Sequence, residues 1–190
     1  MLWDDYINSY WRDWRTGDRS QDKDRLEDQQ WLGEWLVQHN LPAAAVPEPA
    51  ELAKLQELRG LLRAEVQKLV QGVPPDQTLL DQLNGYMAEG PCIRQIVRKP
   101  DKPPELSLLP QRSDWGQIMA EIAASFGEAV LDKDTSRFRI CDNPDCLWVY
   151  YDDTRNRSKR YCDDKMCGNL MKVRRFRARK KAGDGEQNTD

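Results

Sequence analysis

The chain has 190 residues, which suits one domain of ordinary size with a small module attached. Hydrophobic residues make up 39% and charged residues 32%, so a modest core lies beneath a highly charged surface, and the formal net charge is -3. No apolar run approaches the ~20 residues that a membrane span needs, and the first ten residues are acidic where a secretory signal is basic. We therefore expect a cytoplasmic protein without a membrane segment.

The first half of the chain predicts helices. Apolar residues recur at helical spacing from residue 3 to residue 14, and the pattern resumes over 23–39 before it stops ahead of Pro42. The clearest helix lies within 47–72, where leucine and valine residues form one stripe and Gly72 ends it. A shorter helix is predicted from Asp76 to Ala88.

The helical pattern of the first half ends at the Gly90-Pro91 turn. Short apolar stretches on either side of residues 100–104 predict a β-hairpin. A helix is predicted over 114–131, with Ser113 as its N-cap. The predicted fold is mainly α: a helical domain with a β-hairpin insert (1–136), a small cysteine-containing module (137–181) and a disordered acidic tail (182–190).

Four of the five cysteines form two close pairs, Cys141-x4-Cys146 and Cys162-x4-Cys167, with fifteen residues between them. Two such pairs are typical of a tetrahedral structural zinc site. The segment between them predicts a second hairpin, in which 147–151 pairs with 158–162, and a helix follows the last pair. This order is that of a treble-clef module. Two disulfides are the alternative, although cytoplasmic proteins rarely contain them.

The basic residues are concentrated in the same module. Residues 137–181 contain 14 Lys/Arg and 6 Asp/Glu, a net charge of +8, whereas residues 1–136 carry -8 and the tail carries -3. Such a segment attracts polyanions by releasing counterions. The candidate nucleic-acid contacts are Arg155, Arg157, Lys159, Arg160, Lys172, Arg174, Arg175, Arg177, Arg179 and Lys180. A solvated basic face, or one that pairs with the acidic body or with an acidic protein partner, is the alternative.

The stretch from Arg139 to Lys181 resembles the CGNR zinc finger of bacterial regulators, and its four cysteines fall on the metal-ligand positions of that family. It differs at Leu170, where the family has Arg. The upstream residues resemble the ABATE domain of stress-induced transcription regulators, through "DYINS" at 5–9, "LRGLLRAEV" and "EIAASF". The resemblance implies one zinc ion per chain, DNA as the partner, and a helical body that senses a signal or forms a homodimer.

Two residues of the first predicted helix are candidates for binding a small-molecule effector. Asn8 and Trp11 lie within its aromatic stripe and could line a pocket, although a packed core is the simpler interpretation. We do not expect an enzyme. The chain has a single histidine, His39, and it lacks a phosphate-binding glycine loop and a Rossmann signature.

Overall fold

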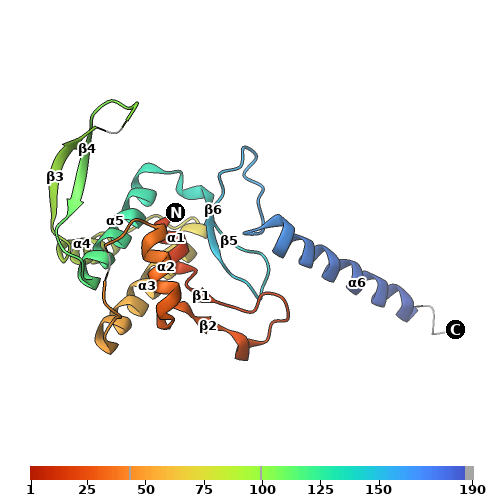
Figure 1. Ribbon diagram of the computed structural model, residues 1–190. Helices are drawn as coiled ribbons and strands as arrows, with labels where there is room; N and C mark the ends of the chain where they lie inside the picture. Colours follow the sequence, from red (N-terminus) through yellow and green to blue (C-terminus); the bar gives the residue numbers. More distant parts are fainter. Residues whose placement is uncertain (43, 99, 187–190) are drawn as a thin grey trace.

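The computed structural model describes residues 1–42, 44–98 and 100–186. Within these residues the fold is mainly helical, as predicted, and it also contains three small antiparallel sheets (Figure 1). The helices are α1 (Leu2–Ile7), α2 (Gln29–Gln38), α3 (Pro49–Val70), α4 (Gln77–Ala88), α5 (Trp115–Asp132) and α6 (Asn169–Glu186). The sheets pair β1 (Tyr10–Trp11) with β2 (Lys23–Asp24), β3 (Cys92–Val97) with β4 (Glu105–Pro110), and β5 (Phe138–Ile140) with β6 (Val149–Tyr151).

The long helices of the body follow the predicted apolar stripes. Leu55, Leu58 and Leu62 of α3 are fully buried, and α5 buries Ile118, Ile122 and Phe126. The predicted N-cap of α5 was wrong by one residue. Asp114, rather than Ser113, is the cap, because its carboxylate reaches the backbone N–H of Gln117 at 3.0 Å and satisfies a donor that the first helical turn leaves free.

The predicted single helix over residues 3–14 was also wrong. α1 ends at Ile7, and the chain then turns into strand β1, which pairs with β2. The helix ends there because of contacts with distant parts of the chain. The side chain of Asn8 forms hydrogen bonds with the backbone of β6, and Ser9 O accepts a hydrogen bond from Arg25 N at 3.0 Å. These contacts outweigh the helical spacing of Tyr10 and Trp11.

The predicted β-hairpin is confirmed as β3–β4, with Cys92 opposite Pro110 and Val97 opposite Glu105. It projects from the body as a two-stranded arm (Figure 1). Its apolar side chains are largely solvent-exposed, the most exposed being Ile96 at 79% and Leu106 at 69%. An isolated two-stranded hairpin with an uncovered apolar surface is marginally stable, so this arm has the character of an interaction surface.

The hydrophobic core continues from the body into the cysteine module. Phe138 of β5 is fully buried, and its ring centroid lies 5.0 Å from that of Trp3 and 6.3 Å from that of Phe126. Val149 of β6 belongs to the same cluster. The chain segment that enters the module is therefore part of the main core, so that the module cannot move freely relative to the body.

Helix α6 leaves the module and extends away from the rest of the molecule (Figure 1). Val173 and Phe176 are 44% and 62% exposed because the projecting helix has no surface to cover them. α6 also continues to Glu186, so residues 182–186 of the predicted disordered tail are helical. Each added residue gains one backbone hydrogen bond, which favours propagation. Residues 187–190 lie outside the described residues.

Candidate metal centre and basic surface

Four cysteine sulfurs converge at the base of α6. The Sγ atoms of Cys141, Cys146, Cys162 and Cys167 all lie within 4.8 Å of one another. The distance is 3.7 Å between Cys146 and Cys162 and 3.9 Å between Cys162 and Cys167. A tetrahedron of sulfurs about 2.3 Å from a zinc ion has edges of about 3.8 Å, whereas a disulfide brings its sulfurs to about 2.05 Å. The cysteines are thus unpaired and positioned to bind one zinc ion.

The first pair is held by a turn built around Asn143, which is fully buried. Its side-chain oxygen accepts from Asp145 N at 3.2 Å, and its backbone oxygen accepts from Cys146 N at 2.9 Å. The amide nitrogen of Asn143 donates to Trp14 O at 3.0 Å and reaches Cys167 Sγ at 3.5 Å. A single side chain therefore links the turn to the fourth ligand and to the N-terminal segment, as second-layer residues at metal sites do.

The second pair lies at the entry to α6. Asp163 accepts a hydrogen bond from Met166 N at 2.7 Å and caps a wide helical turn, Asp164–Gly168, that carries Cys167. The predicted hairpin between the two pairs was wrong: β6 is paired with β5, ahead of Cys141. Residues 158–162, the predicted partner of β6, form no ladder with it and are held by single hydrogen bonds. Tyr150 Oη donates to Lys159 O at 2.8 Å, and Asp142 N donates to Arg160 O at 2.9 Å.

The four thiols cannot all ionise without a cation between them. Hydrogen bonds from Cys146 and Cys162 lower the pKa of Cys141 well below that of an ordinary thiol. The interaction with Cys141 raises the pKa of both Cys146 and Cys162, and burial raises that of Cys167. A divalent ion removes this conflict because it stabilises all four thiolates together. The donor set therefore fits zinc, with all four positions of a structural site supplied by the protein.

Several polar contacts fix the module to the body. The clearest involves Asn8, whose side-chain amide donates to Val149 O at 2.9 Å and accepts from Val149 N at 2.9 Å. Arg63 of α3 donates to Leu147 O at 3.0 Å. Gly17 has a φ of +79°, and a Cβ atom there would lie 2.8 Å from Asp145 Oδ1, so the N-terminal loop approaches the cysteine turn closely. The amide of Asn8, predicted as a ligand contact, is thus engaged within the protein.

Replacing Asn8 with Ala should reduce the free energy of unfolding by about 2–4 kcal/mol, because two buried backbone groups of Val149 lose their partner. Urea denaturation of the zinc-loaded protein measures this loss. The matched control is Asn84→Ala, at an exposed position of α4, which should change stability by less than about 0.5 kcal/mol. Equal stability of the two variants would show that the Asn8 contact is not a structural clamp.

The basic residues between the cysteine pairs belong to a loop that is held in a fixed shape. Asp152, which is fully buried, accepts from the backbone N–H groups of Thr154 at 3.0 Å and Lys159 at 3.1 Å. Arg157 pairs with Asp134 at 2.9 Å and Arg160 with Asp142 at 2.7 Å, and the Lys159 ammonium lies over the Tyr150 ring. Within the described part of the chain, Arg155 is the base of this loop that forms no such contact.

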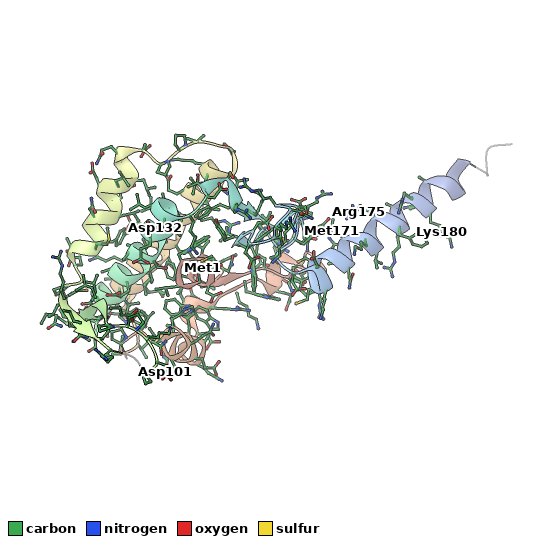
Figure 2. All side chains as sticks on the ribbon, turned by 90° about the horizontal axis from the view of Figure 1, so that it is seen from above. Met1, Asp101, Asp132, Met171, Arg175 and Lys180 are labelled. Carbon is green, nitrogen blue, oxygen red and sulfur yellow. The ribbon has the colours of Figure 1, made fainter. Side chains whose placement is uncertain are left out.

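The bases of α6 fall into two groups. Arg174 and Arg175 anchor the helix: Arg174 pairs with Asp145 at 2.6 Å and donates to Arg15 O at 2.8 Å, and Arg175 donates to Tyr161 Oη at 2.9 Å. The remaining bases are exposed and, among the described residues, have no intramolecular partner; they are Lys172, Arg177, Arg179, Lys180 and Lys181. In Figure 2, α6 leaves the body beyond Met171, and Arg175 and Lys180 lie along its projecting part.

Comparison with known families assigns the two parts of the chain. Residues 2–133 match the ABATE family, described as "Putative stress-induced transcription regulator", and residues 137–180 match the CGNR zinc finger. The chain belongs to the ABATE family. The part of this ABATE protein that matches the zinc finger contains the four clustered cysteines. Leu170, which replaces the family Arg, is half-buried in the first turn of α6. Among curated proteins, no relative matches the chain.

The family description is that of a regulator rather than an enzyme. Within the described residues of the ABATE protein, no helix is long and apolar enough to span a membrane. The sequence pattern identified all four cysteines but not the buried Asn143 that links them. It also could not separate the anchoring arginines of α6 from the free ones, because that distinction depends on Asp145 and Tyr161, which are distant in the sequence.

Proposed function

We propose that this protein is a DNA-binding transcription regulator in which zinc holds a treble-clef-like finger that presents α6 to the DNA backbone. The observation that carries the proposal is the projecting helix, with five exposed bases that have no partner among the described residues. Lysine and arginine at this density neutralise phosphates and release counterions. Arg155, on the loop beside the metal centre, is a further basic residue without a partner among the described residues. It could contact a phosphate or the edge of a nucleobase.

A duplex-binding titration at several salt concentrations tests this proposal. The zinc-loaded protein should bind a mixed-sequence duplex with a log Kd that depends linearly on log salt, with a slope of about 0.9 for each phosphate neutralised. Specific regulators also discriminate between sequences, so selection from a random-sequence pool should enrich a common site. A slope near zero, or no enrichment above the starting pool, would contradict the proposal.

The second candidate function is an adaptor that binds an acidic protein. Val173 and Phe176, exposed among the bases of α6, favour it because protein interfaces bury apolar side chains. The same titration with polyglutamate in place of the duplex separates the two functions. Tighter binding to polyglutamate than to a duplex at equal charge concentration would favour the adaptor, and we expect the reverse.

We also propose that the β3–β4 arm forms a homodimer contact. Ile96 and Leu106 face each other across the strands, and Leu108 lies on the same side of the hairpin. A second copy of the arm would cover these side chains and could extend the sheet to four strands. Sedimentation equilibrium should show a dimer that Ile96→Lys converts to a monomer, whereas Val37→Lys, at a 78% exposed position of α2, should leave it unchanged. A monomeric parent protein would contradict this contact.

A further inference from the structure

A hollow of about 160 Å³ lies where the body meets the zinc finger. Three tryptophans line it: Trp31 and Trp35 from α2, and Trp148, two residues after the second cysteine. Trp31 and Trp35 are stacked, with ring centroids 5.8 Å apart and an interplanar angle of 17°. Trp35 is buried and its ring centroid also lies 5.3 Å from that of His39, whereas Trp31 and Trp148 are half-buried and supply the accessible indole surface. Among the described residues, the lysine and arginine contacts with rings involve Trp14 and several tyrosines rather than these indoles.

The charged side chains around the hollow are two carboxylates and one guanidinium: Asp5, Glu34 and Arg25. Their net charge is -1, so one positive charge placed among them would make the lining neutral. Asp5 is in contact with His39 at 3.0 Å, and Glu34 accepts from Gln30 at 2.9 Å. A neighbouring depression of about 600 Å³ shares Arg25 and Trp31 and is lined by Trp11 and by more acids than bases, so the surroundings also favour a cation.

We propose that this hollow binds a small organic cation, such as a quaternary ammonium group. Aromatic faces attract such cations through the ring quadrupole, and nearby carboxylates supply the counter-charge. The volume is close to that of an engineered cavity of about 150 Å³ that accepts benzene, so a ligand of roughly six to eight non-hydrogen atoms fits. Trp11, predicted from sequence as a ligand contact, lines the adjoining depression rather than the hollow itself.

The position of the hollow connects it to the finger. Trp148 is bonded in the chain to Val149, which Asn8 clamps, and Trp148 O accepts from Cys141 N at 2.8 Å. A ligand against Trp148 therefore touches the segment that joins the second zinc ligand, Cys146, to β6. This step rests on the proposed DNA-binding function, whereas cation binding itself does not. Ligand and duplex should then alter each other's Kd by the same factor, about fivefold or more.

The test titrates the zinc-loaded full chain with choline chloride, without DNA, and follows tryptophan fluorescence and the melting temperature. The control ligand is 3,3-dimethyl-1-butanol, which has the same shape without the charge, and sodium chloride matches the ionic strength. Choline should quench the fluorescence saturably and raise the melting temperature by mass action. The neutral alcohol should do neither at the same concentration. Equal effects of choline and the alcohol, or no effect of either, would overturn the proposal.

Two variants with matched geometry locate the site. Glu34→Gln should raise the Kd for choline by about threefold to tenfold, because it removes one counter-charge. Asp81→Asn is the control: Asp81 also accepts from a glutamine one turn earlier, at 2.8 Å, but lies on α4 outside the hollow. Unchanged binding by Glu34→Gln would place the cation elsewhere. Repeating the choline titration with saturating duplex tests the coupling, and an unchanged Kd for choline in protein that binds DNA would refute it.

Discussion

Replacing Cys162 with Ser should abolish zinc binding and unfold the finger. The parent protein should hold one zinc ion per chain, and the variant none, by metal analysis after gel filtration. Structural zinc contributes about 10 kcal/mol or more to folding of a small finger, which is comparable with the whole stability of a domain. Without it, the charged segment 141–181 has too little apolar surface to stay folded.

The body should respond as well, because Phe138 and Val149 belong to its core. We therefore expect the Cys162→Ser protein to keep the helices of the body but to melt at a lower temperature, with loss of near-ultraviolet circular dichroism. Cys92→Ser is the matched control, since Cys92 is exposed on β3 and lies outside the metal centre. A Cys162→Ser protein that retains one zinc ion and the parent melting curve would contradict the assignment of the ligand set.

Replacing Arg177, Arg179 and Lys180 together with Ala should weaken duplex binding without unfolding the protein. These side chains are exposed on the projecting part of α6 and lie outside every core cluster. If each contacts one phosphate, the salt slope should fall by up to ~2.7, and the Kd near 0.15 M salt should rise by about a hundredfold. Fluorescence anisotropy with a labelled duplex measures both quantities.

The control removes three positive charges from elsewhere: Lys23, Lys54 and Lys102 are exposed on the body and in the loop between β3 and β4. Alanine at these positions should change the Kd only through net charge, by much less than the α6 variant. Equal losses in the two triple variants would show that α6 is not the contact surface. Arg174 is unsuitable for this test because it pairs with Asp145. Removing Arg174 would loosen the first turns of α6 from the rest of the finger.

The features that could be predicted from the sequence are those fixed by local patterns. The leucine stripe of α3, the hairpin β3–β4 and the cysteine pairs each depend on spacing within a short segment, and each is present. The features that could not be predicted depend on distant partners. α1 ends at Ile7 because Asn8 is held by Val149, 141 residues away in the chain.

The pairing of β6 in the finger also depends on a distant part of the chain. Two segments could pair with β6: residues 158–162 and β5. Phe138 of β5 packs against Trp3 and Phe126 in the core of the body, and the segment 158–162 has no such contact among the described residues. The choice of β5 therefore depends on burial in the body. Local strand signals alone could not reveal it.

The central claim is that zinc fixes α6 in the orientation that binds DNA. The most direct measurement is the duplex Kd of one protein sample at a fixed salt concentration, before zinc removal by a chelator, after it, and after zinc is restored. The account predicts that chelation weakens binding by at least tenfold and that zinc restores it, because α6 loses its fixed base when the cysteine cluster opens. A Kd that is the same in all three states would contradict the account.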